Sequence, residues 1–94
     1  MIDDMKEKQL EKIFKALANK RRIAIVKYVY KHKAGEATVG EISRAIKLSF
    51  KSTSRHLAVL NDADIIDREQ RNIEVYYFLS AQKHPIIKQL LVIL

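Results

Sequence analysis

Residues 48–66, with the sequence LSFKSTSRHLAVLNDADII, gather side chains that can hydrogen-bond to an anion. Small hydroxyls, two cations and a histidine stand close together: Ser49, Lys51, Ser52, Thr53, Ser54, Arg55 and His56. Serine and threonine are mediocre helix formers because their hydroxyls compete for backbone hydrogen bonds. At the start of a helix, however, small hydroxyls let the backbone approach a duplex and bind phosphates or base edges.

The apolar residues of this stretch predict which side of the helix is buried. Ser49 is a good N-cap, and Thr53, Leu57 and Leu60 share one side of the helix that follows. The opposite side carries Lys51, Arg55, Ala58 and Asp62, with Ser52 and Ser54 on its flanks. Because Lys51 and Arg55 are four residues apart, we expect both to point away from the core together.

Two helices are predicted upstream of this stretch. The first has one apolar stripe, formed by Leu10, Ile13, Phe14 and Leu17. The second is capped by Asn19 and runs from about Lys20 to His32. Its inward-facing residues are predicted to be Ile23, Val26 and either Val29 or Tyr30.

A loop and a short helix lead to the hydroxyl-rich stretch. Residues 31–37, KHKAGEA, are predicted to be the loop. Thr38 and Glu41 have the spacing of a capping box, in which each side chain caps the other residue's backbone amide. The short helix that they open holds the apolar residues Ile42, Ala45 and Ile46.

The periodicity changes after Ile66 from helical to alternating. Residues 73–79 alternate as a strand does, and residues 66–69 can pair with them in a hairpin around residues 70–72. Pro85 suits the first turn of a last helix, and seven of the nine residues from Ile86 onward are apolar. A helix that is apolar on nearly every side needs cover from more than its own domain, so we expect a dimer.

Together these elements predict a mainly α fold with a small β-hairpin (α+β), in the order α-α-α-α-β-β-α. Two helices joined by a tight turn at residues 47–50 and followed by a hairpin make a winged helix-turn-helix. Residues 1–94 are expected to be one domain, with the helix-turn-helix at about 38–63 and the wing at about 66–79. The helices at about 3–18 and 84–94 are expected to form the dimer.

The charge distribution favours a polyanionic partner. The chain has a net charge of +7 and a pI of about 9.8, and residues 12–33 hold eight cations and no acid. In a winged helix-turn-helix, the second helix of the pair enters the DNA major groove with its first turns. Arg55 could then bind a guanine edge in bidentate fashion, whereas Lys51 is better placed for a phosphate. The alternative is an ordinary surface helix with capping serines.

Several blocks of the chain resemble the ArsR-type winged-helix transcriptional regulators over roughly residues 10–80. They are IFKALANKRRIAIVKYV, TVGEISRAIKLS, STSRHLAVL and VYYFL. The most specific is SRHLAVL, followed four residues after Leu60 by Asp64-Ile65-Ile66. The resemblance implies a homodimeric repressor built on the first and last helices, with an inverted-repeat operator on double-stranded DNA.

Two sets of site residues follow from this interpretation. The expected DNA-binding residues are Thr38, Ser49, Lys51, Ser52, Ser54, Arg55, His56, Arg68, Arg71 and Asn72. The expected dimer-interface residues are Leu10, Ile13, Phe14, Leu17, Ile86, Ile87, Leu90, Leu91, Ile93 and Leu94. The acids Asp67, Glu69 and Glu74 leave the two arginines of the hairpin little net positive field, so we expect a weakly binding wing.

The chain departs from the resembling family at turn positions. Lys47 and Asp64 stand where the family usually has glycine, at the ends of the two helices of the pair. Such positions often need a left-handed backbone, which costs a non-glycine residue about 1 kcal/mol. At the tip of the hairpin, Asn72 is the residue that readily takes a positive φ.

The sequence offers few metal ligands. Members of the resembling family hold metals through cysteines in the helix that begins TVGEI, where this chain has Thr38 and Gly40, or through several ligands on the last helix, where it has His84 alone. A site needs three or four ligands. His32 is expected to be solvated, and His56 to be either packed and hydrogen-bonded or in contact with a phosphate. We therefore expect neither metal sensing nor a cofactor.

Other classes of protein are excluded or disfavoured. Without cysteine there can be no disulfide, zinc-thiolate site or thiol chemistry, and no catalytic constellation is present. The N-terminus lacks an apolar signal core, and LLVIL is too short to span a membrane, so a cytoplasmic protein is expected. A winged-helix module that binds another protein and not DNA remains the alternative.

Overall fold

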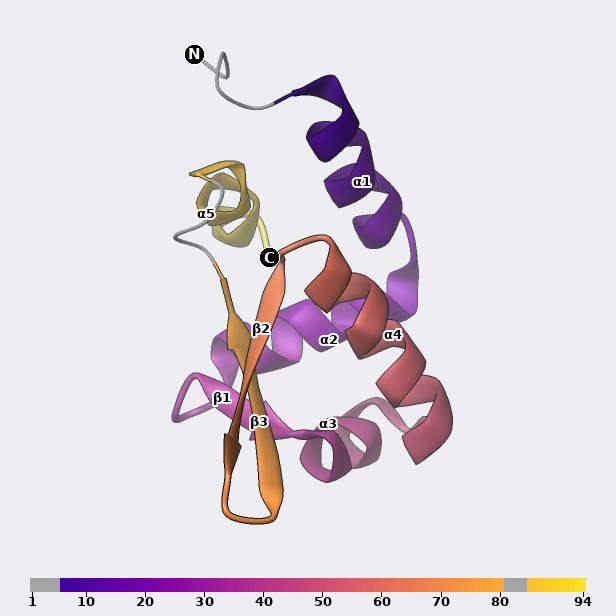
Figure 1. Cartoon of the computed structure of the whole chain (residues 1–94), viewed down its shortest axis with the longest axis vertical. Coiled ribbons are helices and arrows are strands. Elements are labelled where there is room, and N and C mark those ends of the chain that lie inside the picture. Colours follow the sequence, from indigo (N-terminus) through magenta and orange to yellow (C-terminus); the bar gives the residue numbers. More distant parts are fainter. Residues whose placement is uncertain (1–5, 81–84) are drawn as a thin grey trace.

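The computed structural model describes residues 6–80 and 85–94, which form five helices and a small three-stranded sheet. In chain order the elements are α1 (Glu7–Leu17), α2 (Lys20–Lys31), β1 (Glu36–Thr38), α3 (Val39–Ile46), α4 (Phe50–Asp62), β2 (Ile66–Arg71), β3 (Glu74–Leu79) and α5 (Pro85–Val92). The helices α1 and α5 lie at one end of the molecule, and the turn of the β2–β3 hairpin lies at the other (Figure 1). The winged helix-turn-helix that the sequence predicts is confirmed. The first residues of the expected first helix and His84 lie outside the described residues.

Side-chain caps fix where the helices begin. The Asn19 side chain accepts hydrogen bonds from the amides of Arg21 and Arg22 at the start of α2. At the start of α3, the amide of Glu41 donates to Thr38 Oγ1 and the amide of Thr38 donates to Glu41 Oε1. Both caps were predicted from the sequence. They satisfy backbone donors that a helix leaves unpaired in its first turn.

Among the described residues, three that are not glycine adopt a left-handed backbone: Lys47, Asp64 and Asn72, with φ of 57°, 58° and 59°. At the end of α3, Lys47 allows the amide of Leu48 to donate to the carbonyl of Ser43 at 3.0 Å, as in a Schellman motif. The turn predictions for all three residues are confirmed. Non-glycine residues therefore make the sharp turns that separate α3 from α4 and β2 from β3.

The sheet differs from the prediction in one strand and in its turn. Residues 36–37, expected to end a loop, and Thr38, expected to cap the next helix, form β1, which pairs antiparallel with β3 so that Ala37 lies opposite Tyr77. The hairpin turns at Asn72 and Ile73, because Arg71 pairs with Glu74, and Ile73 is therefore outside the strand. A three-residue strand is too short to show alternation in the sequence, which explains why β1 was missed.

The core lies where α2, α3 and α4 meet the sheet. Ile25, Val26 and Val29 form the buried side of α2, whereas Ile23 and Tyr30 are exposed. The prediction of Ile23 as inward-facing was wrong, because the buried stripe of α2 is set by its contacts with α3, α4 and β3. Other fully buried side chains are Ile13, Ile42, Leu57, Leu60, Ile65, Ile66 and Ile87. No helix within residues 6–80 and 85–94 is long and apolar enough to cross a membrane.

Candidate nucleic-acid interface

The first turns of α4 are held by the turn that precedes them. Ser49 Oγ accepts a hydrogen bond from the amide of Ser52 at 3.1 Å, which caps the helix as predicted. The amide of Thr53 donates to the carbonyl of Ser49 at 2.9 Å. These turns of α4 point toward the end of the molecule that carries the hairpin turn, away from α1 and α5 (Figure 1).

The two sides of α4 differ in burial as the sequence predicts. Thr53, Leu57 and Leu60 are fully buried against the core. Lys51 and Arg55 are exposed, and no acid within residues 6–80 and 85–94 forms an ion pair with either of them. The result is a solvent-facing surface with two cations and hydroxyl groups close to a helix N-terminus, an arrangement suited to phosphates and base edges.

His56 is half-buried on α4 and bound to Arg22 of α2. Its Nδ1 lies 3.2 Å from Arg22 Nη1. Because a guanidinium only donates, Nδ1 must be the acceptor, so the neutral ring carries its proton on Nε2. Burial lowers the pKa of His56 below its ordinary value, and the positive charges of Arg22 and Arg21 lower it further. At neutral pH, His56 is therefore neutral and carries its proton on Nε2, which is a hydrogen-bond donor on the same helix as Lys51 and Arg55.

Arg22 joins three helices and was not singled out from the sequence. Besides His56, its guanidinium donates to the carbonyl of Ala16 from Nε and to the carbonyl of Lys15 from Nη2. It therefore caps the end of α1 while it holds a side chain of α4. The basic run KRR did not reveal this role, since nothing in it separates the bound arginine from its neighbours.

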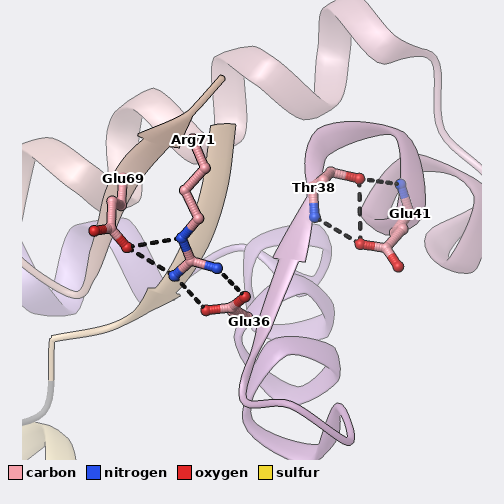
Figure 2. A network of polar contacts seen from close by, with 5 residues as sticks. All are labelled: Glu36, Thr38, Glu41, Glu69 and Arg71. Carbon is pink, nitrogen blue, oxygen red and sulfur yellow. Dashed lines mark hydrogen bonds and ion pairs between the residues drawn. The ribbon is translucent and has the colours of Figure 1, made fainter. Parts of the chain in front are cut away.

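The arginine nearest the hairpin tip is neutralised by two acids. Arg71 donates to both carboxylate oxygens of Glu36 on β1 and to Glu69 Oε1 at 2.7 Å, and the guanidinium fork lies between the two acids (Figure 2). The guanidinium also lies 4.7 Å from the centroid of the Tyr76 ring. The hydrogen bond from Arg71 lowers the pKa of Glu36, and the two acids raise the pKa of Arg71. The positive charge of Arg71 is therefore largely matched locally.

Of the remaining predicted DNA-binding residues, Ser52 and Ser54 are partly buried on α4, and the other three fall into two groups. Arg68 and Asn72 are exposed on the hairpin, and Arg68 has no ion pair with any residue that the structure describes. The hydroxyl of Thr38 is instead used by the capping box: it accepts from the amide of Glu41 and lies 3.2 Å from Glu41 Oε1 (Figure 2). The amide of Thr38 also lowers the pKa of Glu41, which keeps the cap charged.

Two exposed apolar side chains at this end of the molecule were not among the predicted DNA-binding residues. Phe50, the first residue of α4, is 63% exposed, and Ile73, at the hairpin turn, is 94% exposed. Both line a hollow of about 470 Å³ that Gly40, Ser54 and residues of β3 complete. Their sequence pattern is that of ordinary apolar positions, so only the structure shows that they face solvent.

Exposed apolar side chains also occur on the two helices at the other end of the molecule. On α1, Phe14 is half-exposed beside Leu10, and beyond α5 Ile93 is 79% exposed. Three of the expected interface residues, Ile13, Ile87 and Leu91, are instead buried in the core of the chain itself. The other residues expected there are partly exposed: Leu17, Ile86, Leu90 and Leu94.

His32 is partly buried, with 25% of its side chain exposed, whereas we expected it to be solvated. Its ring packs on Tyr28 with centroids 5.3 Å apart, and its Nε2 lies 3.9 Å from Glu41 Oε2. The sequence placed it in a basic loop, but the end of α2 turns it toward α3. Within the described residues there is no group of three or more histidines or acids arranged to hold a metal ion.

Comparisons with known proteins agree with this arrangement. Residues 19–68 match the family model described as bacterial regulatory protein, arsR family. The transcriptional repressor PagR of Bacillus anthracis is 31% identical over 71 residues, which cover 76% of this chain and 69% of that protein. The transcriptional activator HlyU of Vibrio cholerae is 32% identical over 79 residues, which cover 84% of this chain and 70% of that protein.

Solved structures share the fold. HlyU superposes with a TM-score of 0.75 at 29% identity, covering 92% of this chain and 94% of that one. The crystal structure of PagR gives a TM-score of 0.73 at 28% identity, covering 88% and 93%. A homodimeric winged helix-turn-helix DNA-binding domain of Mb0332 from Mycobacterium bovis gives 0.78 at 23% identity, covering 92% and 78%, a likeness in fold.

The match to the family model contains α2, α3 and α4, the helices that build the surface around Arg55 and His56. This match spans more than half of the chain. The relatives at 30% identity or above are similar to this chain over a longer stretch, in sequence and in structure. On these grounds, the chain is a member of the ArsR family of bacterial regulatory proteins, the family that the blocks of its sequence resemble.

Proposed function

We propose that this transcriptional regulator binds an inverted-repeat operator in double-stranded DNA as a homodimer and represses transcription without a metal cofactor. The observation that carries the proposal is the solvent-facing side of α4, where Lys51 and Arg55 have no acid partner among the described residues. Arg55 would read a base edge in the major groove, and Lys51 would bind a phosphate.

The polar groups around these cations would fix the position of α4 on the duplex. The Ser49 hydroxyl accepts the cap hydrogen bond and can still donate its proton to a phosphate. Ser52 and Ser54 flank the exposed side, and the Nε2–H of His56 adds a donor. Because Arg22 holds the His56 ring, this donor would meet DNA in a fixed orientation.

The hairpin would contribute less to affinity. Its surface offers Arg68 and Asn72, while Arg71 is bound by Glu36 and Glu69. Thr38 is not expected to contact DNA through its hydroxyl, since the capping box uses it.

The dimer would form through α1 and α5. Phe14 of α1 and Ile93, which follows α5, are exposed large apolar side chains, and α1 and α5 lie at the end of the molecule opposite the hairpin turn. Burying each such side chain is worth roughly 1.5–3 kcal/mol. A symmetric pair would place two copies of α4 about 34 Å apart, or a multiple of this distance, and the operator would then be an inverted repeat.

The absence of metal sensing is proposed from the chemistry of α3. Thr38 is engaged in its cap and Gly40 has no side chain, so neither is a ligand for a soft metal. Zinc, cadmium or nickel at micromolar concentration should leave operator affinity unchanged. A stoichiometric metal complex that changes DNA affinity would overturn this part of the proposal.

Selection of bound sequences from a random pool of duplex DNA tests the proposal as a whole. We expect an inverted repeat whose affinity falls steeply with salt, because phosphate contacts release counterions. Repression is shown if the protein, bound at the selected site, blocks transcription from an overlapping promoter in a purified system. A chain that binds no duplex at low salt would instead be the protein-interaction module.

A further inference from the structure

A groove between α2 and α3 combines an apolar floor with a basic rim. Its volume is about 580 Å³, within the range of sites for small molecules. The floor is formed by Ala24 and Tyr28 of α2 and by Ala45 and Ile46 of α3. Tyr28 and Ile46 pack against the hydrophobic core, so the floor is held in place from beneath.

The rim carries three lysines. Lys27 and Lys31 lie one turn apart on α2, and Lys33 follows in the loop. All three are exposed, and none forms an ion pair with any residue in the part of the chain that the structure describes. Cations gathered around one hollow raise the local concentration of anions.

His32 also lines the groove, and one of its ring nitrogens has no hydrogen-bond partner among the described residues. Its ring packs on Tyr28, and its Nδ1 is buried without a hydrogen-bond partner within residues 6–80 and 85–94. A buried nitrogen without a partner costs free energy, so the wall of the groove contains a polar position that a bound molecule could satisfy after a small rotation of the ring.

We propose that this groove binds a small organic anion with an apolar body, such as an aromatic or medium-chain carboxylate. The body would lie on Tyr28 and Ile46, and the carboxylate would meet Lys27 and Lys31. Duplex DNA fits these features less well, because phosphate contacts need cations but no concave apolar floor.

The groove lies next to the turn that orients α4. Ala45 and Ile46 are the last two residues of α3, and Lys47 follows with its left-handed backbone. An occupant pressed against the end of α3 would shift the angle between α3 and α4, and with it the position of Lys51 and Arg55. This regulatory consequence rests on the proposed function, whereas binding of the anion does not.

The test is a nuclear magnetic resonance titration of the ¹⁵N-labelled full chain with 4-phenylbutyrate and, separately, with the uncharged 4-phenyl-1-butanol. We expect amide shifts centred on Tyr28, Ala45 and Ile46, and binding of the acid about tenfold tighter than of the alcohol, or 1.4 kcal/mol. Shifts centred on α1 and α5, or equal affinity for the two probes, would overturn the proposal.

Variants separate the rim from general charge effects. Lys27→Glu with Lys31→Glu should weaken binding of 4-phenylbutyrate about tenfold. Lys8→Glu with Lys20→Glu changes the net charge equally at exposed positions outside the groove and should leave affinity within about twofold. Equal loss in both pairs would contradict a built site. Ala45→Phe places a large side chain on the floor of the groove and should prevent binding of 4-phenylbutyrate. If this variant is folded, as judged by circular dichroism, and binds the acid as the parent does, the proposal is overturned.

A gel shift on the selected operator, with and without 4-phenylbutyrate, tests the link to DNA. Altered affinity in the parent chain but not in Ala45→Phe supports the link, and unchanged affinity at saturating acid overturns it. If the chain binds no duplex at all, the proposed function fails, while the titration still decides whether the groove binds the anion.

Discussion

The first turns of α4 and the β2–β3 hairpin each carry two cations, but they present them differently. Lys51 and Arg55 face solvent without an acid partner among the described residues. On the hairpin, Arg71 is bound by Glu36 and Glu69, and the strands add further acids beside Arg68. The number of cations therefore does not set the electrostatic field that a DNA phosphate meets. The position of the acids around them does.

The largest expected effect comes from disrupting the proposed dimer, because a monomer presents one copy of α4 to the operator and a dimer presents two. Phe14→Glu with Ile93→Glu places charges at two exposed apolar positions and should give monomers. Operator affinity should then fall on the order of 100-fold. Analytical ultracentrifugation at micromolar concentration and a gel shift measure the two effects. A monomeric parent chain, or a monomeric variant with full affinity, would contradict the dimer. Substituting Leu91 would be uninformative, because it is buried in the core.

The next effect removes the base contact that we assign to α4. Arg55→Ala should weaken operator binding by about 1–3 kcal/mol and relax the preference at one base position. The reason is that Arg55 is the exposed guanidinium on the helix expected in the major groove. Fluorescence anisotropy on the selected site and on single-base variants measures both changes. Unchanged affinity and preference would remove Arg55 from the DNA-binding surface.

A smaller effect is expected from removing the acids that bind Arg71, so that the hairpin presents an unpaired cation as α4 does. Glu36→Gln with Glu69→Gln leaves Arg71 without its two acids, so DNA affinity should rise about threefold and depend more steeply on salt. Glu7→Gln with Glu11→Gln removes the same charge on α1, at the end of the molecule opposite the hairpin turn, and serves as the control. An equal rise in both variants would mean that net charge, and not the release of Arg71, controls the contribution of the hairpin.

The smallest expected effect is a pH dependence of the free energy of unfolding, which comes from His56 on α4. The pKa of His56 is lowered in the folded chain, chiefly by burial, so the unfolded chain binds more protons between the two pKa values. The contribution of His56 to the free energy of unfolding is therefore fully present above the ordinary pKa of 6.5, and it is lost as the pH falls through the pKa of the folded chain. Urea unfolding from pH 7 to 5 should show this loss, and His56→Gln should reduce it. A His56 resonance that titrates above 6.5 would contradict the contact with Arg22.

Local patterns made the helix-turn-helix predictable. Caps at Asn19, Thr38 and Ser49 depend on neighbouring residues, and the burial of Leu57 and Leu60 follows from helical spacing. The left-handed turns at Lys47 and Asp64 could also be expected, because their positions resemble those where the family has glycine. These features were predicted because their causes lie within a few residues of each other.

The features that were missed depend on contacts between distant parts of the chain. Arg71 and Glu36 are 35 residues apart and meet only because β1 pairs with β3. Arg22 reaches His56 across 34 residues, because α2 and α4 pack together. The sequence contains these residues but gives no sign of which pairs will meet, so the neutralised arginine and the held histidine emerge only from the fold.

The most direct test compares paired substitutions in the two regions on the selected operator at one salt concentration. Lys51→Ala with Arg55→Ala should weaken binding on the order of 100-fold, since it removes a base contact and a phosphate contact from each α4. Arg68→Ala with Arg71→Ala should stay within about fivefold of the parent, because Arg71 is already bound by acids. Equal losses, or a larger loss from the hairpin pair, would contradict the claim that α4 is the principal DNA-binding surface.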